Sequence, residues 1–64
     1  MRIDRIKLAT EMARSEIKVY ELAAKAGISR ATIIAIKGGK SCQEETAVKL
    51  AAGLGVPLAD LLPE

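Results

Sequence analysis

The chain has 64 residues, a formal net charge of +2, one Cys, one Tyr, and no His, Phe or Trp. A chain of this length forms one domain with a thin core, because a domain of about 60 residues buries only about 60% of its unfolded surface. Without His and with a single Cys, it cannot build a Cys/His zinc site or a Ser-His-Asp or Cys-His nucleophile, so we expect no enzyme, no metal and no cofactor.

The composition favours helix-forming aliphatic and charged residues and is poor in aromatics, which predicts an all-α fold. The first helix is predicted from near Asp4 to about Ser15, with the Asp4 carboxylate at its positive N-terminal end. Ile17, in the connection that follows, is expected to turn inward. The inner stripe of this helix is expected to comprise Leu8, Met12, Ala9 and the aliphatic stem of Arg5.

Residues 19–38, VYELAAKAGISRATIIAIKG, predict a helix, a short turn and a second helix. Gly27 follows the earlier helix, where a left-handed backbone costs a residue with a Cβ about 1 kcal/mol or more. Ala23 is small enough to let the two helices cross closely. The residues expected to point inward are Leu22, Ala23, Ala26, Ile28, Ile33 and Ile36. Those expected to face outward are Arg30, Ala31, Ile34 and Ala35.

The ends of these two helices differ in their expected caps. The earlier helix spans roughly residues 19–25, and Lys18 stands where Ser or Thr is preferred, so this end is expected to fray. Ser29 can cap an amide in the first turn of the later helix. That helix is predicted over residues 30–37 and stops at the glycine pair that follows it.

The fourth helix is predicted to begin with Glu44 and Glu45, whose charges complement the helix dipole, and to end at Gly55. Pro57 suits the first position of a last short helix. The apolar side of the fourth helix is expected to carry Val48, Leu50, Ala51 and Leu54. The last helix is expected to fold back onto the core through Leu58, Leu61 and Leu62. Five short helices in a single domain, residues 1–64, are therefore predicted.

Two features bear on the compartment. A lone Cys42 cannot form an internal disulfide, is most simply a small apolar core filler, and is compatible with a reducing cytoplasm. No apolar run approaches the ~20 residues needed to span a bilayer, and the N-terminal MRIDRIKLATEM carries charges where a signal peptide needs an apolar stretch. We therefore expect a cytoplasmic protein with no membrane segment.

The charge is unevenly distributed along the chain. Residues 1–40 carry nine Lys or Arg against four Asp or Glu, whereas residues 41–64 carry one against four. A basic helical portion beside an acidic C-terminal portion is typical of a nucleic-acid-binding module with a separate end that faces solvent or a partner. Ordinary solvated surface charge explains the same pattern about equally well.

Two longer stretches carry a family likeness. The run LAAKAGISRATIIAIKGGK, followed by ETAVKLAAGLGVPLADLL, resembles the lambda repressor and Cro-like helix-turn-helix family, also called the XRE family of transcriptional regulators. The likeness covers residues 8–62. Its most specific parts are Leu22-Ala23, Gly27-Ile28-Ser29, Thr32-Ile33, Gly39-Lys40, Leu50-Ala51 and Leu54-Gly55-Val56. The resemblance implies a compact, five-helix, lambda-repressor-like domain that binds double-stranded DNA as a small transcriptional regulator.

The resemblance also implies that the helix over residues 30–37 inserts into the major groove. The residues implied to contact bases are Ser29, Arg30, Ala31, Ile34 and Ala35. Arg30 can donate two hydrogen bonds to guanine, a contact worth about 1–3 kcal/mol of discrimination, whereas the three apolar residues can only contact thymine methyl groups. Alternatives stay open: Arg30 as a solvated charge, and Ile34 as a buried or self-association residue.

The phosphate-contacting residues implied by the resemblance are Lys18, Tyr20, Lys37 and Lys40. The chain departs from the family pattern in three ways. Val19 stands where many relatives carry a phosphate-binding Gln, and Ile34 stands where a polar residue is common. Lys37 stands where Glu is common, and on a gap-free alignment Met12 replaces its usual Arg partner. Lys37 is therefore expected to be free to reach a phosphate.

Operators of this family are usually paired half-sites, so the resemblance implies a homodimer. The candidate dimer interface comprises Val56, Pro57 and Leu62, whereas core closure within one chain better explains Leu58 and Leu61. The rival hypothesis is a protein-interaction module of the same fold, for example an antitoxin or phage-type regulatory partner. In that case Ile34 and Ala35 would form an apolar docking patch.

Overall fold

The computed structural model describes all 64 residues, which form four α-helices and one short 3-10 helix, with no strands. The elements are α1 (Arg5–Arg14), α2 (Val19–Ala26), α3 (Arg30–Lys37), α4 (Glu44–Leu54) and η1 (Leu58–Leu61). The all-α prediction is confirmed, but the prediction of five helices is corrected to four α-helices followed by a 3-10 turn. The last element is a single 3-10 turn, because Pro57 is an extended N-cap and Pro63 disfavours a helical backbone at Leu62.

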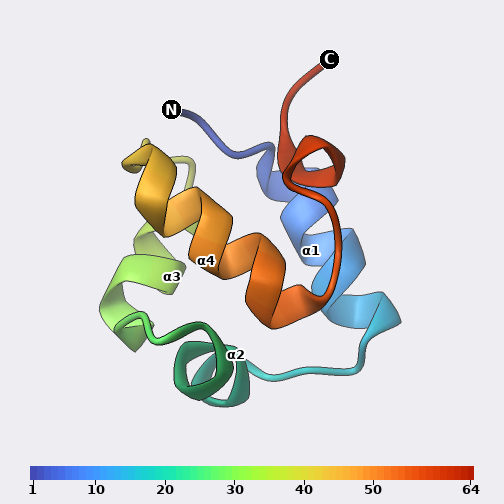
Figure 1. Cartoon of the computed structure of the whole chain (residues 1–64), viewed down its shortest axis with the longest axis vertical. Helices are drawn as coiled ribbons and strands as arrows, with labels where there is room; N and C mark the ends of the chain where they lie inside the picture. The colour runs from blue at the N-terminus through green and yellow to red at the C-terminus, as the bar shows by residue number, and fades with distance from the viewer.

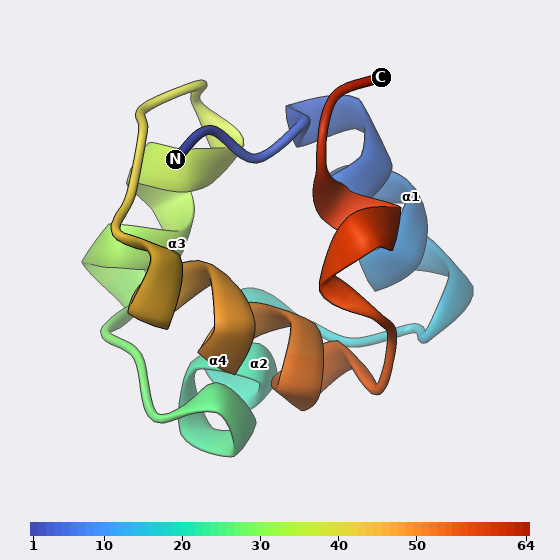
Figure 2. The ribbon, with the colours of Figure 1, turned by 45° about the horizontal axis from the view of Figure 1, so that its top comes forward.

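α4 runs through the middle of the molecule, with α3 on one side and α1 on the other (Figure 1). α2 packs across α4, and η1 lies between α4 and α1, so the C-terminal segment returns to the first helix (Figures 1 and 2). Every element contributes to one core. The fully buried large side chains are Leu8, Leu22, Ile33, Ile36, Leu50 and Leu61.

The helix caps differ partly from expectation. The Asp4 carboxylate accepts from the N–H groups of Ile6 and Lys7 at 2.9 and 3.0 Å, which confirms the cap of α1. At the start of α2 the Lys18 side chain makes no capping bond, as expected, but the Glu21 carboxylate accepts from the Lys18 N–H at 2.9 Å, a contact that was not predicted and that opposes fraying. This is the Glu half of a capping box, which needs no acceptor on the N-cap side chain.

Two predicted apolar stripes need correction. On α1, Leu8 and Met12 are buried, but Ala9 and Arg5 are exposed, and the third buried side chain is Glu11. On α4, Val48 is 49% exposed, and its place in the stripe belongs to Ala47, which is fully buried. The α4 stripe of Ala47, Leu50, Ala51 and Leu54 keeps helical spacing, whereas Val48 lies one residue out of phase.

α2 and α4 approach each other closely at Gly53. A Cβ added at Gly53 would lie 2.9 Å from the Ala26 Cβ and 3.1 Å from the Leu22 Cδ1. Gly53 therefore allows α4 to approach α2 closely, a role that no local sequence pattern indicates. The expected inward position of Ile17 is confirmed, since it packs against the core.

Candidate nucleic-acid interface

The turn between α2 and α3 has the predicted geometry. Gly27 has a left-handed backbone with φ 71° and ψ 36°, and its N–H donates to the Ala23 carbonyl at 2.9 Å. The Ile28 N–H donates to the same carbonyl at 3.1 Å, and the Ile28 side chain packs against the core. The turn therefore fixes the direction in which α3 leaves α2.

One face of α3 is held by the core and the other is left to solvent. Ile33 and Ile36 are 0% and 1% exposed, so they anchor the helix from beneath. The Ser29 hydroxyl accepts from the Thr32 N–H at 3.1 Å, which confirms the cap of α3. Because its inner face is buried and its N-terminal end is capped, the same side chains of α3 always face outward.

The predicted base-contacting residues occupy that outer face to different extents. Arg30, Ala31 and Ile34 are exposed, Ile34 by 60%, whereas Ala35 is half-buried. Ser29 is exposed, but its hydroxyl is already engaged in the cap and lies 2.7 Å from the Thr32 hydroxyl. Arg30 and Ile34, one turn apart, are therefore the long side chains on this face.

A groove joins this face to the N-terminal end of α2. It is lined by Val19, Tyr20, Arg30, Ala31 and Ile34. Val19 was not among the predicted site residues. The signal that could have found it is its position at the start of α2, where many relatives are expected to carry a phosphate-binding Gln.

The four predicted phosphate-contacting residues, Lys18, Tyr20, Lys37 and Lys40, are all exposed. Lys18 and Tyr20 lie at the start of α2, and the other two lie at the end of α3 and in the loop after it. This loop is fixed, because the Lys40 N–H donates to the Ala35 carbonyl at 3.0 Å and the Cys42 N–H donates to the Met1 carbonyl at 2.8 Å. Two lysines thus lie at and after the C-terminal end of α3, and Tyr20 lies beside its N-terminal residues Arg30 and Ala31.

No ion pair neutralises the cations of this surface. They join Lys7 with Glu64, Arg14 with Glu11, and Lys49 with Glu45, at 3.6, 3.4 and 3.3 Å, and none involves α2, α3 or Lys40. Lys37 lies beside α1 and shares a groove with Arg5, Ala9 and Ala13, none of which is acidic. Met12, its expected counterpart on α1, is instead buried in the core.

The predicted dimer residues lie near the C-terminus. Pro57 is exposed, whereas Val56 and Leu62 are half-buried and pack against the core. Leu61 is fully buried and Leu58 is half-buried, which agrees with closure of the core within one chain. Of the three predicted interface residues, Pro57 alone is fully available at the surface.

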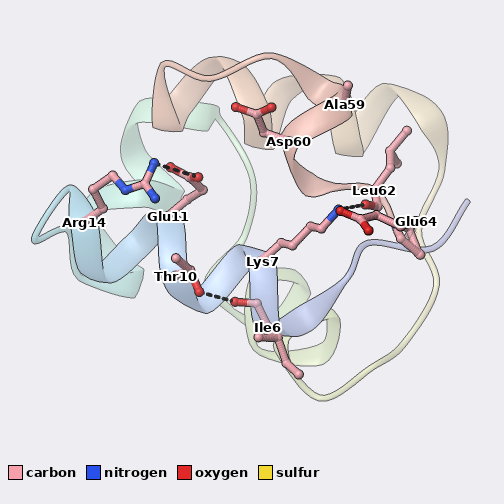
Figure 3. Close-up of a pocket in the computed structure, with 10 residues that line it drawn as sticks. Ile6, Lys7, Thr10, Glu11, Arg14, Ala59, Asp60, Leu62 and Glu64 are labelled. Atoms are coloured by element: carbon pink, nitrogen blue, oxygen red, sulfur yellow. Dashed lines mark hydrogen bonds and ion pairs between the residues drawn. The ribbon is translucent and has the colours of Figure 1, made fainter.

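A second hollow lies between α1 and the C-terminal segment (Figure 3). Two of its polar side chains bond backbone carbonyls of the hollow: the Lys7 Nζ donates to the Leu62 carbonyl at 2.7 Å, and the Thr10 hydroxyl donates to the Ile6 carbonyl at 2.8 Å. No three His, Cys, Asp or Glu side chains are grouped so as to hold a metal ion. None of the helices has the length and apolar character needed to cross a membrane.

Comparison with known proteins agrees with this geometry. The family model of the Cro/C1-type HTH DNA-binding domain matches residues 7–63, which include all of α2, α3 and α4. The chain belongs to the Cro/C1-type helix-turn-helix family of DNA-binding domains, and the family resemblance found in the sequence is confirmed. A search of curated proteins gives no significant match.

Two solved structures of PhpD share the fold. One is the native protein with cadmium atoms, and the other is PhpD with cadmium complexed with hydroethylphosphonate. Each has a TM-score of 0.84 and 26% sequence identity, and the match covers 100% of this chain and 14% of the PhpD chain. The chain is therefore similar to a small part of PhpD.

Proposed function

We propose that the chain is a small transcriptional regulator that binds double-stranded DNA sequence-specifically, with α3 inserted in the major groove. The observation that carries this proposal is the outer face of α3, where an exposed Arg30 without an ion-pair partner stands on a helix anchored by Ile33 and Ile36. A rigid helix with a free guanidinium suits a base edge, because little side-chain rearrangement is then needed on binding.

Base recognition depends mainly on Arg30. Its guanidinium can donate in parallel to guanine O6 and N7, the strongest single contact available to this helix. Ala31, Ile34 and the half-buried Ala35 offer only apolar contact, and the Ser29 hydroxyl contributes as far as its capping bond allows. The proposed recognition surface therefore combines one polar contact with an apolar remainder.

The flanking lysines and Tyr20 position the helix on the duplex. Lys18 and Tyr20 at one end, and Lys37 and Lys40 at the other, are exposed and suited to neighbouring phosphates. A second copy of the chain would contact a second half-site through an interface around Val56, Pro57 and Leu62. The proposed regulator acts in the cytoplasm, and the proposal includes no catalytic activity.

Selection of bound duplexes from a random pool tests this proposal. We expect a consensus made of two related half-sites in inverted order, and a dimer on that duplex in sedimentation experiments. A single unrepeated site bound by one chain would contradict the dimer, and recovery of no consensus would contradict sequence-specific binding.

Salt dependence tests the electrostatic part separately. Affinity for the selected duplex should fall steeply with salt, and Lys40→Ala should reduce the slope of log K against log salt by about one. Lys25→Ala is the matched control, because Lys25 is also exposed but shares a hollow with Glu21 and Gly53, on the α4 side of α2. Equal slopes for the two variants would contradict the contact assigned to Lys40.

A protein-interaction module is the second candidate. Ile34 and Tyr20 are 60% and 56% exposed in one groove, an apolar surface that a protein partner could also cover. Absence of binding to any duplex at low salt, together with a partner whose binding is lost in Ile34→Ser, would favour it.

A further inference from the structure

We propose that two copies of the chain associate through the exposed face of α1, with their α1 helices side by side and parallel across a two-fold axis. This inference goes beyond the proposed function, because it requires no DNA and uses a surface other than the predicted interface around Pro57. Ile6 on this face is 72% exposed, more than any other large hydrophobic residue of the chain. α1 lies at the edge of the molecule (Figure 2), and no other element covers this side chain.

The exposed face of α1 has the spacing of a helix-pairing surface. Ile6, Ala9 and Ala13 are exposed at intervals of three and four residues, and they line one groove together with Thr10. Apolar residues at this spacing pair parallel helices, and the two alanines let the backbones approach closely. The Thr10 hydroxyl already donates to the Ile6 carbonyl at 2.8 Å, so a partner can cover this side chain without leaving its donor unpaired.

Unpaired charges of opposite sign lie on the two sides of this face. On one side, Arg5 and Lys37 line the same groove, and neither forms an ion pair. On the other side, Ile6 and Thr10 also line the hollow against the C-terminal segment (Figure 3). Asp60 lines that hollow and forms no ion pair. The apolar face therefore separates two free cations from a free carboxylate.

The cations of the hollow do not neutralise Asp60. Lys7 pairs with Glu64 at 3.6 Å, and Arg14 pairs with Glu11 at 3.4 Å. Each of these cations already has a carboxylate of its own. The side of α1 that faces the C-terminal segment therefore keeps one negative charge for a partner.

This charge pattern selects a second copy of the chain as the partner and a parallel arrangement of the two helices. A two-fold axis parallel to α1 places the Arg5 side of each copy against the Asp60 side of the other. An antiparallel pair would place each side against itself, so that cations would face cations. Because opposite charges across a contact favour association and like charges oppose it, the face is complementary to itself in the parallel arrangement.

Sedimentation equilibrium of the complete chain without DNA tests the proposal. At concentrations up to about 1 mM, we expect an equilibrium between monomer and dimer. Ile6→Ser should weaken association about ten-fold or more, since covering this side chain in both copies contributes at least ~1.4 kcal/mol, which is ten-fold. Ile34→Ser is the matched control, because Ile34 is a similarly exposed isoleucine on α3, and it should leave the dimerisation constant unchanged.

Exchange of charges tests the pairing across the two-fold axis. Asp60→Lys and Lys37→Glu should each weaken the dimer at low salt, because each places like charges opposite one another. The double variant Lys37→Glu, Asp60→Lys should dimerise more tightly than either single variant, because it restores opposite charges at the contact. A double variant no tighter than the single ones would contradict this pairing.

Disulfide cross-linking tests the direction of the helices. In a Cys42→Ser background, Ala13→Cys should form a covalent dimer on oxidation with diamide, because parallel pairing brings the two copies of this position together. Ala24→Cys is the matched control, since Ala24 is an exposed alanine on α2. Equal cross-linking of the two variants would overturn the parallel arrangement.

The outcomes separate this inference from the proposed function, because no readout involves DNA. A chain that stays monomeric throughout overturns the inference. So does a dimer that persists in Ile6→Ser and is lost in Ile34→Ser or Pro57→Ser, which would place the contact on another surface. Loss of the dimer in Ile6→Ser supports it, whether or not any duplex is bound.

Discussion

The two basic surfaces of this small domain differ in what their charges do. On α1, the Lys7 Nζ donates to the Leu62 carbonyl at 2.7 Å, and Arg14 pairs with Glu11 at 3.4 Å. On the other side, Arg30 and Lys40 are exposed and form no ion pair. Lys7 and Arg14 on α1 bind the C-terminal segment and the buried carboxylate of Glu11. Arg30 and Lys40 have no such partner and remain available to a ligand.

This difference shows why the distribution of charge along the chain was only a partial guide. The basic part, residues 1–40, includes both kinds of cation. Acidic residues that neutralise charge on α1 come from α1 itself and from the C-terminus, 57 positions after Lys7 in the case of Glu64 (64 − 7 = 57). Only the folded structure separates the paired cations from the free ones.

The largest expected effect is the loss of folding stability in Leu61→Ala, in the part of the core that lies beside α1. Leu61 is fully buried and belongs to η1, which packs between α4 and α1. Leu61→Ala should lower the free energy of unfolding by about 3 kcal/mol, because it removes buried carbons and leaves a cavity. Urea denaturation measures this change. Ile34→Ala on the exposed side should change it by less than about 0.5 kcal/mol, and equal losses in the two variants would erase the distinction between the surfaces.

Arg30→Ala is expected to have its effect on binding alone. It should cost about 2 kcal/mol of affinity for the selected duplex and remove the guanine preference at one position of each half-site. The free energy of unfolding should stay the same, since the Arg30 side chain has no partner in the fold. A variant that binds all duplexes uniformly less well, with the preference intact, would assign Arg30 to a phosphate instead.

Much of the architecture could be predicted because its signals are local. Asp4 and Ser29 cap the following turns, and Gly27 ends α2 in the left-handed conformation, each within a few residues of the feature that it determines. The register of a short helix is less secure. Val48 and Ala47 differ by one position, and only packing against the rest of the core shows that Ala47 is the buried one.

Features that depend on distant residues could not be predicted. Gly53 had no assigned role because Ala26, its neighbour across the helix contact, lies 27 positions earlier in the chain (53 − 26 = 27). In the site, Arg30, Ala31 and Ile34 were predicted, whereas Val19 joined them only when the fold brought the two helices together around one groove. The sequence pattern predicted which residues of α3 face outward. That Ala35 is half-buried could be seen only in the structure.

Arg14→Ala is the counterpart of Arg30→Ala on α1, where this cation has an ion-pair partner. Glu11 has a side chain only 10% exposed, and its carboxylate loses its ion-pair partner in this variant. A desolvated charged group left without a partner is destabilising, so the free energy of unfolding should fall by about 1 kcal/mol, and affinity for DNA should stay the same. Recovery of stability in the double variant Arg14→Ala, Glu11→Gln would show that the carboxylate is the cause.

The smallest expected effects concern Lys7, which contacts both the Glu64 carboxylate and the Leu62 carbonyl. Its Nζ lies 3.6 Å from the carboxylate of Glu64, whose side chain is 93% exposed, and 2.7 Å from the carbonyl of Leu62. An exposed ion pair at this distance is largely screened by water, so Glu64→Gln should change the free energy of unfolding by less than about 0.5 kcal/mol. Lys7→Met should cost about 1 kcal/mol, because it removes the hydrogen bond that fixes the C-terminal segment against α1. Thermal unfolding at low and high salt distinguishes these causes, since the Lys7→Met loss should persist in salt if the carbonyl bond dominates and disappear if the ion pair does.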